Sequence, residues 1–191
     1  IRGGGICALV ILISGTSSAQ LTANFTSDIT SGCLPLVVHF QDQSTGDPDQ
    51  WTWNLGNGTI SQQQNPTTTY FTPGIYTVKL TVSNGSATDS ITKMQYIIVR
   101  ANPAAYFSLS DSSGCFPKSI QFSDQSIAGS GNIAQWTWDF GDGNLSSIQN
   151  PSHSSTAAGS YNVTLKVVNS FGCENTFSKP NAVQLQNLVA D

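Results

Sequence analysis

The 191-residue chain contains an internal repeat with a period of about 85 residues, and this repeat limits the fold more than any other feature. Residues 51–84 of the first copy match residues 136–169 of the second, and Cys33 matches Cys115 at a spacing of 82. The shorter spacing arises because the second copy has three additional residues between Ser126 and Trp136, where we expect a surface loop. The repeat predicts two copies of one small domain, over residues 20–100 and 101–187.

The composition favours an extracellular protein built from strands. Seven basic and 11 acidic side chains give a net charge of −4, and uncharged polar, β-branched and aromatic residues are frequent. No basic patch is available to neutralise phosphates, so we do not expect nucleic acid as a partner.

The first 19 residues have the order of a signal peptide. Arg2 precedes an apolar run at residues 6–13, and the small residues Ser17 and Ala19 follow it. Eight apolar residues are too few to span a bilayer. We therefore expect residues 1–19 to be cleaved after Ala19, the mature protein to be secreted and no membrane span to be present. A buried strand is the alternative interpretation of the apolar run.

The last four residues, 188–191, predict the start of a third copy. They place Ala190 85 residues after Ala105, which lies in the opening of the second copy. A frayed tail is the alternative interpretation.

Apolar and polar residues alternate in segments that we expect to form strands. Trp53 and Trp138 lie in central segments, and Tyr76 and Tyr161 begin late ones, which are the positions of the buried Trp and the tyrosine corner in an immunoglobulin-like fold. The expected fold class is all-β, with two tandem immunoglobulin-like β-sandwiches. The expected strands are residues 34–40, 51–55, 76–82 and 93–99 in the first copy, and 119–122, 136–140, 161–167 and 181–186 in the second.

A Gly-rich turn follows the central strand in each copy. Asn57-Gly58 and Asp142-Gly143 are hairpin signals, because both residues of each pair tolerate positive φ. The same stretch offers Asp139 and Asp142 as weak calcium ligands. A calcium site needs six or more oxygen ligands, which the sequence does not supply here, so we interpret the motif as a turn.

These motifs resemble the PKD (polycystic kidney disease) domain family. That family has the pattern W-D-F-G-D-G, then N-P-x-H-x-Y, then G-x-Y-x-V-x-L-x-V-x-N. The second copy departs from it at Ser155, and the first copy departs at Asn54, Leu55, Asn57 and Thr68. The motif residues that match in both copies, and to which we assign structural roles, are Trp53, Gly56, Gly58 and Tyr76 with Trp138, Gly141, Gly143 and Tyr161.

The resemblance implies non-catalytic modules of the kind found in bacterial secreted and surface proteins. We expect no enzyme activity and no cofactor. The expected function is an extracellular spacer or adhesin-like array, and its partners would be neighbouring repeats or other surface proteins. The alternative is a carbohydrate- or protein-binding accessory region of a secreted hydrolase, with polysaccharide as a partner.

Three cysteines remain after the predicted cleavage. Within an immunoglobulin-like domain, Cys115 and Cys173 would lie at opposite ends of the sandwich, about 25 Å apart, which is too far for a disulfide. If the domains stack, the last hairpin of the second reaches the end of the first, so we favour Cys33–Cys173. A Cys115–Cys173 bond and the absence of any bond remain alternatives, and Cys115 would await a cysteine in a third copy.

Four other side chains are candidates for a site. We interpret His39 as a surface residue and His153 as a structural hydrogen-bonding residue of the NPSH turn. Trp51 and Trp136 share a face with the core Trp residues, so packing at the rim is the favoured interpretation and a sugar-stacking platform is the alternative.

Overall fold

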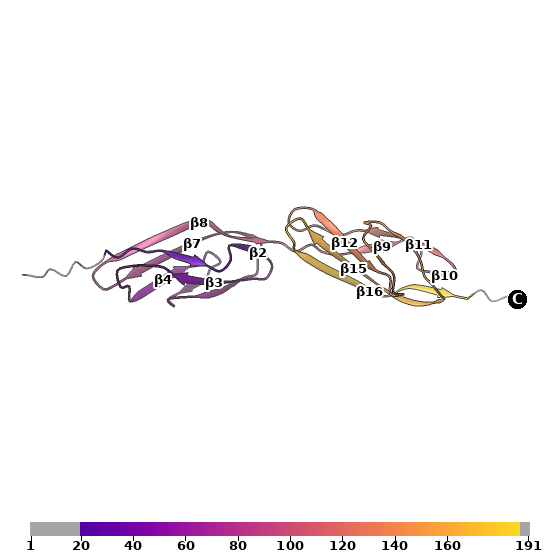
Figure 1. Ribbon diagram of the computed structural model, residues 1–191, viewed down its shortest axis with the longest axis horizontal. Coiled ribbons are helices and arrows are strands. Elements are labelled where there is room, and N and C mark those ends of the chain that lie inside the picture. Colours follow the sequence, from indigo (N-terminus) through magenta and orange to yellow (C-terminus); the bar gives the residue numbers. More distant parts are fainter. Residues whose placement is uncertain (1–19, 188–191) are drawn as a thin grey trace, which may run out of the picture.

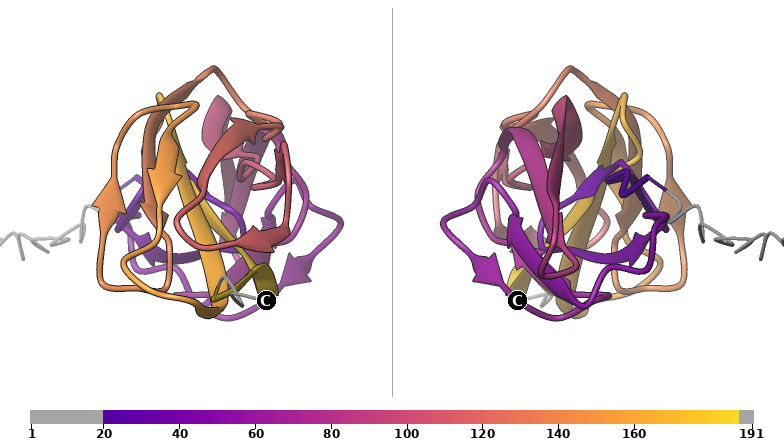
Figure 2. Two further views of the ribbon diagram at one scale, coloured as in Figure 1. Left: turned by 90° about the vertical axis from the view of Figure 1, so that its right-hand side faces the viewer. Right: turned by 90° about the vertical axis from the view of Figure 1, so that its left-hand side faces the viewer.

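The computed structural model describes residues 20–187, which form two β-sandwiches arranged end to end (Figure 1). Seen along the long axis, the two domains largely overlap, so the second adds length and little width (Figure 2). The predicted signal peptide, residues 1–19, and the predicted start of a third copy, residues 188–191, lie outside the described residues. In the described part of the chain, no helix is long and apolar enough to cross a membrane.

The first domain pairs a three-stranded sheet with a five-stranded one. The small sheet has the order β1-β3-β6, and the large sheet has the order β2-β8-β7-β4-β5. Neighbours are antiparallel except β2 and β8, which run parallel. The strands are β1 (Phe25–Ser27), β2 (Ser31–Cys33), β3 (Leu36–Asp42), β4 (Gln50–Asn54), β5 (Ile60–Ser61), β6 (Thr67–Tyr70), β7 (Gly74–Ser83) and β8 (Thr88–Arg100).

The second domain repeats this topology strand for strand. Its small sheet has the order β14-β11-β9 and its large sheet the order β10-β16-β15-β12-β13, with β10 and β16 parallel. The strands are β9 (Phe107–Leu109), β10 (Ser113–Cys115), β11 (Ser119–Asp124), β12 (Ile133–Asp139), β13 (Leu145–Ser146), β14 (Ser152–Ser154), β15 (Gly159–Asn169) and β16 (Glu174–Gln186). The predicted fold class is confirmed.

Each core is built around the Trp of the central strand. Trp53 and Trp138 are fully buried, and each packs edge-on against a Phe of the first strand, Phe25 at 5.1 Å and Phe107 at 5.2 Å between ring centroids. Aliphatic residues of β7 and β15, which alternate as predicted, complete the two cores. Buried apolar surface is the main stabilising contribution to such domains, so each sandwich has its own source of stability.

The last strand of each domain is longer than the segment that its apolar pattern predicted. We expected residues 93–99 and 181–186, but β8 begins at Thr88 and β16 at Glu174. Both strands contain an irregularity, with positive φ at Gln95 and Asn181, that shifts the alternation of inward residues. The first half of each strand is therefore a polar hairpin arm that periodicity does not detect.

Candidate functional site

A disulfide joins the two domains. Cys33, the last residue of β2, is bonded to Cys173 in the β15–β16 hairpin, with 5.5 Å between the Cα atoms. This confirms the favoured pairing, and Cys115 is a free, exposed thiol, so the alternative Cys115–Cys173 bond is wrong. The separation of 140 residues means that the bond fixes the relative position of two sandwiches rather than the interior of one.

Polar and aromatic contacts surround the disulfide. The Asn102 side chain donates a hydrogen bond to the Leu34 carbonyl at 2.8 Å, and Leu34 N–H donates to the Arg100 carbonyl at 3.1 Å. The Arg100 guanidinium lies 3.9 Å from the centroid of the ring of Phe171, which precedes Cys173 by two residues in the same hairpin. The hairpin of the second domain is thus attached to the first by a covalent bond and a cation–π contact. The hydrogen bond from Asn102 attaches the connecting segment to the same end of the first domain.

The three-residue insertion of the second copy lies at this junction. It forms a largely exposed loop, as expected. Within this loop, Ser130 accepts a hydrogen bond from Ala101 N–H at 2.9 Å and donates its own N–H to the Ala101 carbonyl at 3.3 Å. Gly129 has φ of +69°, and a Cβ there would lie 2.2 Å from the Asn102 carbonyl oxygen. The insertion therefore packs against the segment that connects the two sandwiches.

The Gly-rich motif forms a hairpin turn in both copies, but its conformation differs from our expectation. Positive φ occurs at Gly56 and Gly58 in the first copy and at Gly141 and Gly143 in the second. Asn57 and Asp142 are not among the residues with positive φ, so that part of the prediction is wrong. The Asx side chains act instead as acceptors for backbone N–H groups two residues later, as Asp142 does for Asn144 at 3.1 Å.

Asp142 and His153 form a buried pair beside this turn. Asp142 Oδ2 lies 2.8 Å from His153 Nε2, and the Asp142 side chain is 1% exposed. The imidazole stacks on Phe140 with 4.0 Å between centroids. In the first copy the equivalent residues, Asn57 and Thr68, are joined by a 3.1 Å hydrogen bond. Both copies therefore connect the turn to the neighbouring sheet, through Asp and His in the second copy and through the neutral side chains Asn and Thr in the first.

Asp139 and Asp142, the predicted weak calcium ligands, already bind backbone and side-chain groups. Asp139 accepts a hydrogen bond from Gly141 N–H at 2.9 Å, and both oxygens of Asp142 have partners. No group of three or more His, Cys, Asp or Glu residues placed to hold a metal ion occurs within residues 20–187. The calcium site stays a prediction, which thermal unfolding with and without added calcium would test.

The second domain is expected to lose stability below about pH 4 through Asp142. Burial raises the pKa of Asp142, but hydrogen bonds from His153 and Asn144 outweigh it and leave that pKa below its usual value of 3.8. A carboxyl group with a lowered folded-state pKa stabilises the protein above its unfolded pKa, and this contribution disappears as the pH falls through the folded pKa. Guanidinium unfolding of the domain between about pH 2 and pH 7 measures the effect.

The matched control for the pH effect is Asp142→Asn combined with His153→Thr, which gives the second domain the neutral pair of the first. Its free energy of unfolding should depend less on pH in the acid range than that of the unmodified domain. An unchanged dependence would contradict a role for Asp142.

Two glycines of the turn should respond differently to substitution. Gly141→Ala would place a Cβ 2.3 Å from the Asn162 carbonyl oxygen, whereas a Cβ at Gly143 has no neighbour within 4 Å. Both have positive φ, which costs about 1–2 kcal/mol for Ala, and crowding adds about 1–3 kcal/mol for Gly141 alone. Denaturant unfolding of both variants checks this order, and equal losses would contradict the steric account.

The other shared motif residues bind the loops to the sheets. The indole N–H of Trp53 donates to the Gln63 carbonyl and that of Trp138 to the Ile148 carbonyl, each at 2.9 Å. The Tyr76 hydroxyl donates to the Thr72 carbonyl and the Tyr161 hydroxyl to the Ala157 carbonyl, each at 2.7 Å. Both hydrogen bonds have the geometry of a tyrosine corner.

Trp51 and Trp136 lie at the rim of the cores, half-buried. Each indole N–H crosses between the sheets to a carboxylate, from Trp51 to Asp42 at 2.8 Å and from Trp136 to Asp124 at 2.7 Å. An open hollow lies beside each ring, of about 330 Å³ in the first domain and about 390 Å³ in the second. The linings are polar apart from the rings and one Ala: Asp49, Gln50, Thr52 and Gln62 in the first, and Ala134, Gln135, Thr137 and Ser147 in the second.

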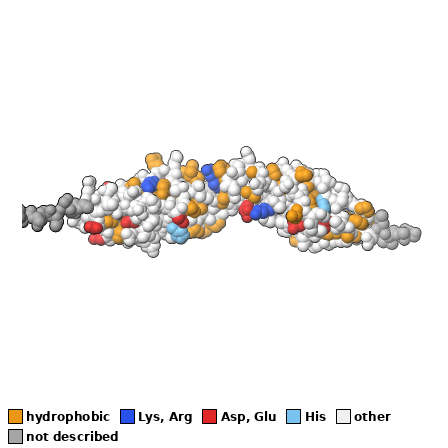
Figure 3. Space-filling view, in the orientation of Figure 1, with side chains coloured by type: hydrophobic (Ala, Val, Ile, Leu, Met, Phe, Trp, Pro, Cys, Tyr) orange, Lys and Arg blue, Asp and Glu red, His pale blue; other side chains and the backbone are white. Residues whose placement is uncertain are grey.

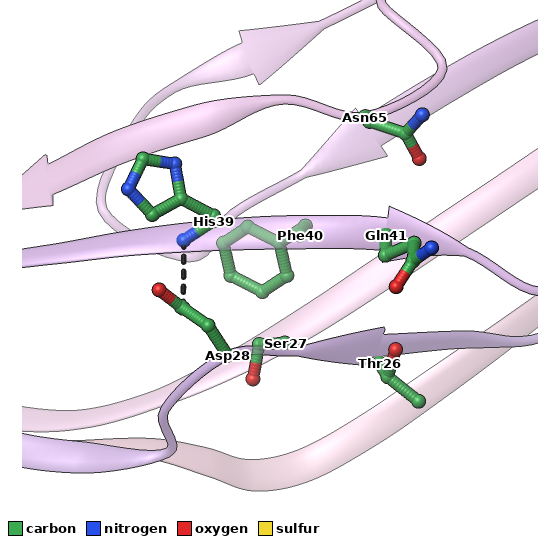
Figure 4. Close-up of a pocket in the computed structure, with 7 residues that line it drawn as sticks. All are labelled: Thr26, Ser27, Asp28, His39, Phe40, Gln41 and Asn65. Carbon is green, nitrogen blue, oxygen red and sulfur yellow. Dashed lines mark hydrogen bonds between the residues drawn. The ribbon is translucent and has the colours of Figure 1, made fainter.

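A third hollow, of about 400 Å³, lies on the small sheet of the first domain and includes His39 (Figure 4). His39 is exposed, as its predicted surface position requires. Its backbone N–H donates to Asp28 Oδ1 at 2.9 Å, and its ring nitrogen Nδ1 lies 2.8 Å from Thr67 Oγ1. Phe40 supplies the only benzene ring of the lining, and it is 2% exposed. The hollow therefore offers polar groups but no aromatic platform.

Both copies match one known family. Residues 17–99 and residues 100–185 each match the PKD domain. The chain belongs to the PKD domain family. The pre-pro-metalloprotease PrtV of Vibrio cholerae serotype O1 is 38% identical to it over 71 residues, which are 37% of this chain and 8% of PrtV. This PKD chain therefore spans a small fraction of the length of that relative.

Solved PKD domains are similar to one copy at a time. The match with the PKD1 domain of Vibrio cholerae PrtV covers 45% of this chain and 99% of the PrtV domain, at 32% identity and a TM-score of 0.40. The PKD1 domain of Vibrio anguillarum Epp covers 46% and 99%, also at 32% identity and a TM-score of 0.40.

Sequence reasoning missed most of the junction between the PKD domains. Asn102, Arg100 and Phe171 have no role in the repeat motifs, and the predicted domain boundary falls between Arg100 and Ala101. The available signal was the extra segment before Trp136, which breaks the repeat where the two domains meet.

Proposed function

We propose that the two PKD domains form a rigid, non-catalytic spacer of an extracellular protein. The observation that carries this proposal is the Cys33–Cys173 bond, which joins the end of one sandwich to the start of the next. Disulfides form and persist in oxidising compartments, so the bond also supports an extracellular location. Few residues of the chain are charged, and Figure 3 shows few charged side chains on the face that it presents, which suits a passive connecting element.

The rigidity is expected to depend on the disulfide. Without it, two small sandwiches joined by a short segment would reorient, since interfaces between domains of one chain commonly permit motion. Small-angle X-ray scattering of residues 20–187 should fit one elongated particle. The Cys33→Ser/Cys173→Ser variant should require a mixture of bent and straight forms. Identical scattering from both proteins would contradict a stiffening role for the bond.

A second candidate function is a polysaccharide-binding accessory region, and the paired hollows beside Trp51 and Trp136 favour it. Each hollow combines part of an indole ring with amide or hydroxyl side chains, the groups that orient a sugar. The similarity to a pre-pro-metalloprotease suits an accessory region of a hydrolase. Retention on insoluble polysaccharides that Trp51→Leu/Trp136→Leu abolishes, with both domains still folded, would support this function over the spacer alone.

A further inference from the structure

We propose that the Cys115 end of the second domain, residues 113–117 and 184–186, is a docking surface for a third PKD domain of the same polypeptide. The docking would be fixed by a disulfide from Cys115 to a cysteine on the last hairpin of that domain. The inference rests on the proposed spacer function and deepens it by naming the partner.

The polypeptide leaves both domains beside the equivalent cysteine. Cys33 is the register partner of Arg100, the last residue of β8, and Cys115 is the register partner of Gln186, the last residue of β16. The residue after each cysteine donates its N–H to that last residue, at 3.1 Å in the first domain and 2.8 Å in the second. A domain attached after Gln186 would therefore begin where the second domain begins relative to Cys33.

The same surface is occupied in the first domain and uncovered in the second. On the first domain, Cys33 is bonded to Cys173 and the Leu34 carbonyl accepts a hydrogen bond from Asn102. On the second domain, Cys115 is exposed and has no bonded partner. The first domain thus shows, within one molecule, what kind of element binds this surface and through which atom.

The occupant must carry a thiol on the hairpin between its last two strands, where Cys173 lies. A second copy of the chain offers no such thiol. Cys173 is already bonded, and the equivalent hairpin of the first domain has Ser86 and Ala87. Cys7 belongs to the predicted signal peptide. A further domain that has its own hairpin cysteine is the occupant that fits these conditions.

Bond formation is an oxidation with a defined acceptor. The Cys115 thiol and the hairpin thiol each lose one proton and one electron as the S–S bond forms. The two electrons reduce a disulfide of a thiol–disulfide oxidoreductase in the same compartment to two thiols. This is the same balance that forms Cys33–Cys173.

Peptide mapping of the full-length native protein tests the inference. The protein is alkylated with iodoacetamide without reduction and digested, and the Cys115 peptide is identified by mass spectrometry. We expect it to be linked to a hairpin peptide of another PKD domain of the same chain. The linked form of the Cys115 peptide should be at least ten times as abundant as the alkylated form. In a Cys115→Ser variant, the partner cysteine should become alkylated instead.

The other outcomes overturn the inference. Alkylated Cys115, a Cys115–Cys115 bond between two chains, or a mixed disulfide with a small thiol would each contradict it. The Cys33–Cys173 peptide is an internal control in the same digest. If the Cys33–Cys173 peptide is present and Cys115 is alkylated, the proposed contact with a third domain is wrong and the spacer proposal is unaffected. If the Cys33–Cys173 peptide is absent, both proposals lose their basis.

Discussion

Trp138→Ala is expected to unfold the second PKD domain and to leave the first folded. The side chain is fully buried, with ring centroids 5.2 Å from Phe107 and 5.6 Å from Phe122. Removing a buried Trp costs about 3–5 kcal/mol in transfer and cavity free energy. The Ile148 carbonyl also loses its indole donor, which adds about 1 kcal/mol or more. The total is comparable to the whole stability of many small domains, about 5–15 kcal/mol.

Denaturant unfolding followed by tryptophan fluorescence would measure this loss, and limited proteolysis would locate it. The matched variant is Trp53→Ala, which removes the equivalent ring from the first domain. Each variant should make only its own domain sensitive to protease. Loss of both domains in either variant would contradict the conclusion that each sandwich has an independent core.

Removal of the interdomain disulfide is expected to produce the second large effect, a loss of stability shared by the two domains. A cross-link lowers the entropy of the unfolded chain, and for a separation of 140 residues the chain-entropy relation gives about 5 kcal/mol. The native fold of each domain should survive, because neither hydrophobic core cluster contains Cys33 or Cys173. The Cys33→Ser/Cys173→Ser variant should therefore unfold at lower guanidinium concentration while keeping the circular dichroism spectrum of the folded protein.

The control for the disulfide is Cys115→Ser. Its thiol is exposed and free, so the substitution should change the free energy of unfolding by less than about 0.5 kcal/mol. A comparable loss in both proteins would show that the measured effect comes from cysteine replacement in general and not from the bond.

The repeat and the alternation of apolar residues were sufficient to predict the fold. They located the longer strands and the buried Trp residues, because burial on one face of a strand imposes a period of two on the sequence. They did not reveal β1, β2, β5, β6 or the equivalent strands of the second domain, since two to four residues are too few to show that period. The polar arms of β8 and β16 were missed for the related reason that they bury little on either face.

The parts of the site that depend on strand topology could be predicted from the sequence. The parts that depend on the geometry of individual residues could not. The Cys33–Cys173 pairing follows from which ends of two stacked sandwiches meet. The turn conformation was wrong because Gly56 and Gly141 take the positive φ that Asn-Gly and Asp-Gly signals assign to the Asx residue. The Asn102 and Arg100 contacts depend on the orientation of one domain relative to the other, which no periodicity encodes.

The position of the disulfide determines how the molecule responds to a pulling force. From residue 20, the covalent path to residue 187 can run through Cys33 directly to Cys173, so residues 34–172 lie in a closed loop that bears no tension. Fully extended, that loop would add roughly 480 Å at about 3.5 Å per residue. An oxidised chain stretched between its ends can release only the short segments outside the loop. Single-molecule stretching should therefore detect the missing length only after a reductant has opened the bond, and the intact pair of domains should behave as a nearly inextensible tether.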